Sequence, residues 1–423
     1  MDILVVGGGG REHAVIKALS KSRRSGKIYA LPGNGGIAED AECIPVKATD
    51  IEGIVRVARE KKVDFAVVTP DDPLVLGCVD ALEAAGIPCF GPTKDAAIIE
   101  GSKVFSKELM KKYGIPTAKS ETFSEPDAAI AYLKSAPYPA VIKADGLALG
   151  KGVVIAKDFE EAKEAVRNMM VDHVFGASGS RILVEEFLTG PEVSVLSFTD
   201  GNIVVPMLSS MDHKRAKDGD EGLNTGGMGT VAPNPYYTEE VAKECMEQIF
   251  LPTIRAMKAE GRTFKGCLYF GLMLTKDGPK VIEYNCRFGD PETQVVLPLL
   301  VSDLLEIMLA VRGGTLREDM VRFREGAACC VVLASEGYPQ KYETGFEITL
   351  PVCGANEDIY IAGAKREGDK LVTSGGRVLG AVATAEDLKS AVEAAYALAG
   401  RISFQNAYMR HDIGKRALAA LKN

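Results

Sequence analysis

The 423-residue chain lacks several patterns that would assign it to a common class of protein. No apolar run reaches the roughly 20 residues that span a bilayer, so we expect no membrane segment. The N-terminus enters an apolar strand with no basic stretch before it, which predicts no signal or transit peptide. Nine cysteines occur without a Cys-x-x-Cys pair, and the four histidines show no metal-ligand spacing. This cysteine usage favours reduced thiols in the cytoplasm over a disulfide framework or a zinc site.

Blocks of basic residues are also missing, and the formal net charge is -8. Binding to a nucleic-acid backbone requires clustered positive charge, so we expect no nucleic-acid partner. Small phosphorylated ligands are not excluded, because they require only local cations and backbone N–H donors. No feature indicates an obligate protein partner, and we expect a monomer.

The composition is that of a folded globular protein, with 46% apolar and 26% charged residues. A chain of this length exceeds one hydrophobic core and predicts about two to four domains. Residues 1–100 alternate between strand and helix patterns, which predicts a doubly wound parallel sheet. The expected strands are residues 2–6, 27–30, 65–69 and 88–90, and the expected helices are 11–19 and 51–61.

Glycine clusters follow the first two of these strands, at residues 7–10 and 33–36. A dinucleotide fingerprint needs G-x-G-x-x-G and an acid after the second strand. Glu12 or His13 occupies the third glycine position, and the second strand ends at Ala30-Leu31-Pro32 without an acid. A nicotinamide site is therefore disfavoured, whereas a plain tight turn and a phosphate site at a helix N-terminus both stay open.

The rest of the chain predicts further α/β and α+β units. Residues 121–186 form a small α/β pattern, residues 187–322 are mixed, and residues 323–423 read as a separate α+β unit. The expected helices are residues 103–113, 127–134, 159–170, 239–260, 304–312 and 385–398. The expected strands are residues 140–144, 153–156, 182–186, 193–198, 203–207, 327–334 and 377–383, with a glycine-rich loop at 219–229.

The most informative stretch is residues 281–294, which begins as a strand and ends as a polar loop. Strand alternation places Glu283, Asn285 and Arg287 on one face. The opposite row suits a core: Ile282, Tyr284 and Cys286. Glu and Asn supply oxygen ligands of the kind that Mg²⁺ takes beside nucleotide phosphates, and Arg can grip a carboxylate or phosphate. A solvated edge strand explains the pattern about equally well, but the acids Asp290 and Glu292 favour a site.

Three other stretches carry candidate chemistry, and each also has a plain structural explanation. Lys143 ends an apolar strand before a glycine loop at residues 146–152, which could hold phosphates or be a mobile hairpin. Glu185 and Glu192 flank a segment that suggests a hinge for a nucleoside, or an amphipathic edge strand. Asp212-His213-Lys214-Arg215 precedes a glycine-rich segment and suggests a substrate-covering loop, although a solvated charged loop is the simpler interpretation. His213 fits either a base or a satisfied polar residue.

In combination, these stretches resemble the ATP-grasp ligases, and most closely the phosphoribosylamine–glycine ligase family. The resemblance covers the whole chain and rests most strongly on the octet from Arg287 to Gln294. The other matching motifs are residues 7–13, 32–36, 212–215, 224–229, 336–339, 373–378 and 410–414. No Walker-type G-x-x-x-x-G-K-[ST] motif is present as a competing ATP site.

The resemblance implies four parts: an N-terminal domain at 1–101, an ATP-grasp core at 102–120 and 187–322, a lid at 121–186 and a C-terminal domain at 323–423. It implies ATP and Mg²⁺ (or Mn²⁺) as cofactors. It also implies that glycine and 5-phosphoribosylamine are joined to glycinamide ribonucleotide in purine synthesis.

The resemblance also assigns roles to individual residues. Glu283 and Asn285 would bind the metal, and Arg287, Asp290 and Asp212 would be catalytic. The nucleotide would contact Lys103, Lys143, Gly150, Gly152, Glu185, Phe187 and Glu192. The substrates would contact Gly9, Gly10, Asn34, Gly35, Lys214, Asn224 and Glu292.

Two segments depart from the family pattern. Residues 69–72 have Thr and Asp where the family usually has Gly and Glu, and residues 360–364 lack the usual His and Thr. Asp71 keeps a carboxylate, so we expect activity to be retained. The alternatives are another ATP-grasp carboxylate–amine ligase or carboxylase, which would use a different acceptor, and a catalytically silent nucleotide-binding regulator. The regulator is disfavoured by the retained acids and lysines.

Overall fold

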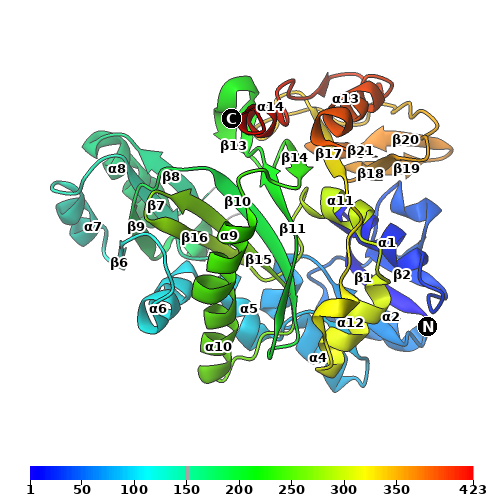
Figure 1. Ribbon diagram of the computed structural model, residues 1–423, viewed down its shortest axis with the longest axis horizontal. Helices are drawn as coiled ribbons and strands as arrows, with labels where there is room; N and C mark the ends of the chain where they lie inside the picture. The colour runs from blue at the N-terminus through cyan, green and yellow to red at the C-terminus, as the bar shows by residue number, and fades with distance from the viewer. Residues whose placement is uncertain (148–151, 423) are drawn as a thin grey trace.

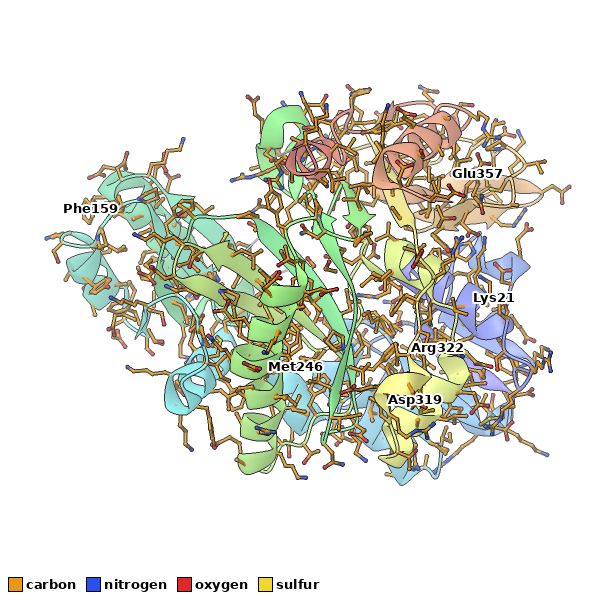
Figure 2. The ribbon with its side chains drawn as sticks, in the orientation of Figure 1. Lys21, Phe159, Met246, Asp319, Arg322 and Glu357 are labelled. Atoms are coloured by element: carbon orange, nitrogen blue, oxygen red, sulfur yellow. The ribbon has the colours of Figure 1, made fainter. Side chains whose placement is uncertain are left out.

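The computed structural model describes residues 1–147 and 152–422. Figure 1 shows an N-terminal α/β unit at the lower right, a small lid-like unit at the left and the C-terminal unit at the top right. A large sheet crosses the space between them. The labels in Figure 2 locate Phe159 in the lid-like unit at the left and Glu357 in the C-terminal unit at the upper right.

The N-terminal unit is a five-stranded parallel sheet in the order β3-β2-β1-β4-β5. Its strands are β1 (Ile3–Gly7), β2 (Ile28–Pro32), β3 (Glu42–Cys43), β4 (Phe65–Val68) and β5 (Cys89–Phe90). Its helices are α1 (Gly10–Ser20), α2 (Ile51–Glu60), α3 (Asp71–Leu76), α4 (Cys78–Ala84) and α5 (Lys94–Gly101). This order confirms the doubly wound prediction. Gly7 is paired with Pro32, so the two glycine clusters meet at one edge of the sheet.

The lid-like unit is a four-stranded antiparallel sheet in the order β6-β9-β7-β8. Its strands are β6 (Ser120–Phe123), β7 (Ala140–Ala144), β8 (Val153–Ala156) and β9 (Ile182–Glu186). It is preceded by α6 (Lys103–Tyr113) and contains α7 (Pro126–Leu133) and α8 (Phe159–Val166). Side chains of α7, α8 and the sheet, among them Leu133, Val166 and Ile142, form a separate hydrophobic core. A separate core lets this unit move as one body.

A nine-stranded sheet joins the middle of the chain to its C-terminal part. The order is β16-β15-β10-β11-β14-β17-β21-β18, and β22 also pairs with β17. The strands are β10 (Glu192–Thr199), β11 (Val204–Asp212), β14 (Gly229–Ala232), β15 (Gly266–Thr275), β16 (Gly278–Asn285), β17 (Ala327–Ser335), β18 (Glu357–Ile361), β21 (Arg377–Ala385) and β22 (Ala407–Tyr408). Because β14 pairs with β17, the sheet runs without interruption past residues 322 and 323, where the sequence predicted a domain boundary.

The remaining elements are two hairpins and the helices that cover the large sheet. The hairpins are β12 (Arg215–Lys217) with β13 (Glu221–Asn224), and β19 (Ala364–Glu367) with β20 (Lys370–Thr373). The helices are α9 (Glu239–Cys245), α10 (Leu251–Ala259), α11 (Thr293–Val296), α12 (Leu304–Gly313), α13 (Leu388–Ala399) and α14 (Lys415–Ala420). Short 3₁₀ turns occupy Ile37–Glu39, Gly176–Gly179, Asp218–Asp220, Leu297–Leu299 and Glu318–Met320.

Several boundaries differ from the sequence predictions. The helix expected at 239–260 is α9 and α10 joined by a π-helical turn, Met246–Phe250, whose first residue is labelled in Figure 2. A second π-helical turn, Arg167–Val171, follows α8. The loop expected at 219–229 contains a hairpin strand, and α13 begins at Leu388, after Asp387 caps it by accepting from the Ser390 N–H. β15 was not predicted.

The predicted architecture is confirmed: a parallel N-terminal α/β sheet, an antiparallel core with a lid-like unit, and a C-terminal α+β unit. Within residues 1–147 and 152–422, every helix is too short or too polar to cross a membrane.

Candidate active site

Strand β16 carries the predicted Glu-x-Asn-x-Arg pattern, and a bulge changes its expected alternation. Gly271 is opposite Glu283, but the next residue of β15, Leu272, is opposite Val281. Ile282 is therefore the extra residue of the bulge. The prediction that Ile282 faces the core is wrong, because Val281 is fully buried in its place and Ile282 is only partly buried. The freed carbonyl of Ile282 accepts a hydrogen bond of 3.0 Å from Lys143 Nζ.

Three lysines from three different elements surround Glu283. Lys214, which follows β11, lies 3.2 Å from Glu283 Oε1, while Lys143 of β7 and Lys103 at the start of α6 interact with the same carboxylate. The charge of Lys214 lowers the pKa of Glu283 to about 2, against the opposing effect of burial. Three cations around one carboxylate leave excess positive charge, which suits an anionic ligand. We call these four residues the lysine end.

Lys103 and Lys214 have opposite pKa shifts. Burial lowers the pKa of Lys103, whose Nζ donates to the Gly146 carbonyl at 3.0 Å. Glu283 raises the pKa of Lys214 well above its ordinary value, and Glu192 lies 4.0 Å away. Lys214 is therefore a permanent cation at this end of the site.

Lys107 is a further cation that the sequence analysis did not identify. Its Nζ lies 3.2 Å from Glu185, which also pairs with Lys143 at 2.9 Å. It also donates to Thr117 and Ala118 in the segment between α6 and β6. Burial lowers the pKa of Lys107 to about 8. Its sequence signal was its position four residues after Lys103, which puts both on one face of α6.

The other predicted nucleotide residues line the junction of the lid-like unit and the core. Phe187 is exposed in the link between β9 and β10, and Glu192 begins β10 with a half-exposed side chain. The Gly152 carbonyl accepts from the Ala144 N–H at 2.8 Å. Gly150 lies outside the described residues.

Arg287 follows β16 and is held by two acids of the N-terminal unit. Its Nη2 lies 3.0 Å from Glu100 Oε1 and 3.9 Å from Asp71 Oδ2. Burial alone would lower the pKa of Arg287, but Glu100 and Asp71 raise it above the ordinary value. Among residues 1–147 and 152–422, nothing accepts from its buried Nε atom. The guanidinium therefore retains one donor for a ligand. Asp71 also places the first departing segment beside Arg287.

The amide orientation of Asn285 is set by its neighbours. Its nitrogen faces two acceptors, donating to Glu100 Oε1 at 3.0 Å and to the Tyr284 carbonyl at 3.1 Å. This orientation leaves the side-chain oxygen of Asn285 as a potential cation ligand. Glu283 beside it is an ionised carboxylate, so the pair fits a hard divalent ion.

No other acidic, histidine or cysteine cluster competes for a metal in this part of the molecule. Across residues 1–147 and 152–422, no three such side chains gather in a way that could hold a metal ion. A Mg²⁺ ion on Glu283 and Asn285 would therefore take its other ligands from phosphate oxygens and water.

The loop after Arg287 contacts the glycine clusters of the N-terminal unit. A Cβ atom on Gly9 would lie 3.3 Å from Asp290 Oδ2, and one on Gly10 would lie 2.7 Å from Gln294 Nε2. Gln294 donates to Asp290 at 2.9 Å. Burial opposes the ionisation of Asp290, but Arg377 and Arg11 lower its pKa below the ordinary value. We call Gly9, Gly10, Asn34, Gly35 and residues 290–294 the glycine end.

Asn34 and Gly35 connect this end to the C-terminal unit. The amide nitrogen of Asn34 donates to the Gly8 and Ile361 carbonyls at 2.9 and 2.8 Å. Its oxygen accepts from the N–H groups of residues 36 and 37, and the Gly35 N–H donates to Ala364. The side chain of Asn34 thus fixes the conformation of the loop at residues 33–36. Residues 360–364, the second segment that departs from the family pattern, pack against this loop.

Asp212, which is partly buried, and Glu292, which is buried, form an acidic pair between the two ends. Burial and the nearby charge of Glu292 raise the pKa of Asp212 well above its ordinary value, and burial also raises the pKa of Glu292. A Cβ atom on Gly227 would lie 2.7 Å from Asp212 Oδ1, so the glycine-rich segment covers this pair closely. Asn224 ends β13, opposite Arg215.

His213 supports the site and does not face it. Its Nδ1 lies 3.0 Å from the Gly229 carbonyl, and its Nε2 accepts from the Gly414 N–H at 3.2 Å. These partners assign a neutral ring with the proton on Nδ1. Burial lowers the pKa of His213 to about 4, which agrees with that assignment. Of the two interpretations of His213, the structure favours the satisfied polar residue.

Models of one protein family match three consecutive parts of the chain. They are described as the N, ATP-grasp (A) and C domains of phosphoribosylglycinamide synthetase, and they match residues 1–100, 101–293 and 328–416. The chain is 49% identical over 413 residues to a phosphoribosylamine–glycine ligase of Caldanaerobacter subterraneus, covering 98% of this chain and 99% of that one. It is 45% identical over 427 residues to the enzyme of the same name from Pasteurella multocida, covering all of both chains.

Solved structures resemble this fold at two levels of similarity. A phosphoribosylamine–glycine ligase from Thermotoga maritima has a TM-score of 0.86 at 35% identity, covering 98% of this chain and 100% of that one. Biotin carboxylase from Campylobacter jejuni, in complex with an ATP analogue, has a TM-score of 0.76 at 16% identity, covering 100% and 95%. At that identity the second likeness shows the shared fold alone.

Proposed function

The chain belongs to the phosphoribosylglycinamide synthetase family, and from this premise we propose that it joins glycine to 5-phosphoribosylamine in purine synthesis. ATP is consumed, and the products are glycinamide ribonucleotide, ADP and phosphate. The observation that carries this proposal is the full-length match to relatives of that activity. The lysine end, three cations around an ionised Glu283, provides the phosphate site that such a reaction needs.

The first step forms an acyl phosphate. A carboxylate oxygen of glycine attacks the γ-phosphorus of ATP, and ADP leaves with the electrons of the broken P–O bond. Lys103, Lys143 and Lys214 hold the phosphates and neutralise their charge, which is the main requirement of phosphoryl transfer. Mg²⁺ on Glu283 and Asn285 would supply further charge neutralisation when bound. Arg287 binds the glycine carboxylate through its remaining donor, Nε.

The second step forms the amide bond. The amine of phosphoribosylamine attacks the acyl carbon, the C–O bond to phosphate breaks, and the amine proton is released. Asp212, Asp290 and Glu292 orient the amine and the sugar hydroxyls. The loops at Gly9–Gly10 and Asn34–Gly35 hold the 5-phosphate near the N-terminus of α1, where helix dipole and N–H groups favour an anion. Asn224 covers the substrates from the other side.

Glu185, Phe187 and Glu192 contact the adenosine in this proposal, and Gly152 contacts the phosphates. Residues 121–186 act as a lid, because glycyl phosphate would hydrolyse in water. We propose the domain limits 1–101, 102–120 with 187–322, 121–186 and 323–423, and the large sheet crosses the last of these limits through the pairing of β14 with β17. The enzyme is a cytoplasmic monomer, and the nine free thiols are consistent with that compartment.

Isotope transfer tests the chemistry. With glycine carrying ¹⁸O in its carboxylate, one labelled oxygen should be found in the released phosphate, and only when phosphoribosylamine is turned over. Phosphate that stays unlabelled would exclude an acyl phosphate.

An omission assay tests the substrates. ADP release should require both glycine and phosphoribosylamine. Release that is supported instead by another acid or amine would identify a different ATP-grasp ligase. ATP binding without any ADP formation would indicate a silent regulator.

A further inference from the structure

Glu100 is a buried acid that connects the N-terminal unit to the strand of the metal site. It lies near the end of α5, is only 7% exposed, and packs against the end of β16. Burying a carboxylate costs folding free energy unless its oxygens are paired. The hydrogen-bond partners of Glu100 therefore indicate its role. None of the family motifs in the sequence includes it.

Its two oxygens contact three consecutive residues of the central stretch. Oε2 accepts from the Cys286 N–H at 2.7 Å. Oε1 lies 3.0 Å from Arg287 Nη2 and accepts from the Asn285 amide nitrogen at 3.0 Å. One side chain therefore fixes a backbone N–H, an amide and a guanidinium where the strand becomes the loop.

We infer that Glu100 is a positioning residue that turns the Asn285 side-chain oxygen toward the metal and holds the Arg287 guanidinium beside it. The inference deepens the proposed function, since it rests on nucleotide-bound Mg²⁺ at Glu283 and Asn285. An amide presents either an oxygen or an NH₂ group to a neighbour, and only the oxygen can bind a cation. Glu100 decides between them because it is an acceptor.

The inference depends on Glu100 being a carboxylate and not an amide. In Glu100→Gln, one of the two positions must become an NH₂ donor. If that donor faces Asn285 and Arg287, it meets two donors, and Asn285 gains a hydrogen bond by rotating its oxygen away from the metal. If it faces Cys286 instead, it meets the backbone N–H. The substitution preserves size but leaves no arrangement that satisfies all three contacts.

The test measures ADP binding to the full-length enzyme by titration calorimetry, with EDTA and with saturating MgCl₂. The ratio of the two dissociation constants is the magnesium effect. In Glu100→Gln, ADP affinity in EDTA should stay within about twofold of wild type, because the lysines are unchanged. The magnesium effect should fall by about 10- to 100-fold, the usual scale for losing a partner that orients a metal ligand.

The matched control is Glu83→Gln. Glu83 also accepts from a cysteine N–H, that of Cys89 at 2.9 Å, and pairs with an arginine, Arg312 at 2.9 Å, but no asparagine within the described part of the chain bonds to it. Its loss should leave the magnesium effect unchanged. Circular dichroism and thermal unfolding check that both variants fold.

A double-mutant cycle tests whether Glu100 acts through Asn285. In an Asn285→Ala background the oxygen is already gone, so Glu100→Gln should reduce the magnesium effect no further. If the two losses multiply as independent effects, the inference is overturned.

Glu100→Asp separates geometry from charge and replaces Glu100→Gln if that variant does not fold. The shorter acid still neutralises Arg287 but cannot reach Cys286 and Asn285 together, so the magnesium effect should again fall. A wild-type magnesium effect in either variant overturns the inference. It is also overturned if the affinity of the wild-type enzyme for ADP is the same with and without Mg²⁺. These readouts need neither glycine nor phosphoribosylamine, so they stand even if the omission assay rejects the proposed ligase reaction.

Discussion

The lysine end and the glycine end bind anions in this proposal, yet they are built in different ways. At the lysine end, long charged side chains from α6, β7 and the segment after β11 converge on Glu283, and Lys143 and Lys103 come from opposite sides of the lid junction. At the glycine end, short residues bring backbone groups together, and the acid Asp290 is locked by Gln294. The first end relies on charge and the second on close packing.

This difference teaches which changes each end tolerates. Charge acts over several ångströms and is carried by flexible side chains, so the lysine end can tolerate the lid movement that we propose for residues 121–186. Backbone donors act only at hydrogen-bond distance, so the glycine end must stay rigid. The rigid end is supported from the C-terminal unit, where Arg377 Nη1 donates to the Gly226 and Asp290 carbonyls, each at 2.9 Å.

Arg287 lies where the two ends meet, and its replacement should have the largest effect. Arg287→Lys keeps the charge but removes the planar fork that can contact Glu100 and a substrate carboxylate together. We expect kcat/KM for glycine to fall on the order of 100-fold, the scale of losing an oxyanion donor. Steady-state kinetics with glycine varied at saturating ATP measures the loss.

Arg312→Lys is the control for that change. Arg312 forms a similar two-pronged contact with Glu83, at 3.1 and 2.9 Å, on the far surface of α12. It should retain wild-type turnover. Near-normal turnover of Arg287→Lys would remove Arg287 from the glycine site.

The sequence predicted much of both ends, because their motifs are local. Each motif is a short continuous segment: the octet from Arg287, the two glycine clusters, and the strand that ends at Lys143. The alternation of strands and helices identified the N-terminal sheet. β15 was missed because its buried run, Cys-Leu-Tyr-Phe-Gly-Leu-Met-Leu, shows no alternation that separates a strand from a helix. The bulge at Ile282 has no local signal, since it arises from pairing with β15.

The contacts that sequence reasoning missed join residues that are far apart in the chain. Glu100 contacts Cys286, 186 positions away, and the Asn34 amide reaches Ile361, 327 positions away. Periodicity and spacing report neighbours on one element and not partners on another. Lys107 is an intermediate case: its helical face was predictable, but its acid, Glu185, was not.

His213 lies between Asp212 and Lys214 in the chain, and its titration should make the stability of this part of the molecule depend on pH. Its pKa is lowered by burial to about 4 from 6.5, so the unfolded chain binds more protons between these pH values. This group's contribution to stability is fully present above about pH 6.5 and is lost as the pH falls toward 4. At pH 5 it should reduce the unfolding free energy by about 2 kcal/mol relative to pH 7.

Urea or thermal unfolding at the two pH values measures that change. His213→Asn retains a donor for the Gly229 carbonyl but does not titrate, so its stability should depend less on pH over this range. An equal pH dependence in both proteins would assign the acid sensitivity to other groups.

Gly10→Ala should damage the glycine end alone. The added Cβ would lie 2.7 Å from Gln294 Nε2, which is buried and bonded to Asp290, so the amide must shift and Asp290 with it. Overpacking of this kind costs about 1–3 kcal/mol. We expect KM for phosphoribosylamine to rise about tenfold while the dissociation constant of ATP stays unchanged.

Gly313→Ala is the control for Gly10→Ala, because its Cβ would make only an ordinary contact, 3.6 Å from Thr315. Both constants should be unaffected there. A Gly10→Ala enzyme with weakened ATP binding would show that the two ends are not independent.

Lys107 gives the smallest expected effect and probes the lysine end by pH. Because its pKa is about 8, it loses its charge as the pH rises past that value. Among residues 1–147 and 152–422, Lys143 is then the one cation still paired with Glu185. Lys143 is held more tightly on Glu185 and is less available to phosphates. KM for ATP should therefore rise about threefold between pH 7.5 and 9, the scale of one net hydrogen bond.

In Lys107→Met the higher KM for ATP should already be present at pH 7.5 and should not change up to pH 9. Lys112→Met is the control, because Lys112 lies on the exposed side of the same helix, and its KM for ATP should change with pH as in wild type. A pH profile that is identical in wild type and Lys107→Met would show that the lysine end does not depend on this pair.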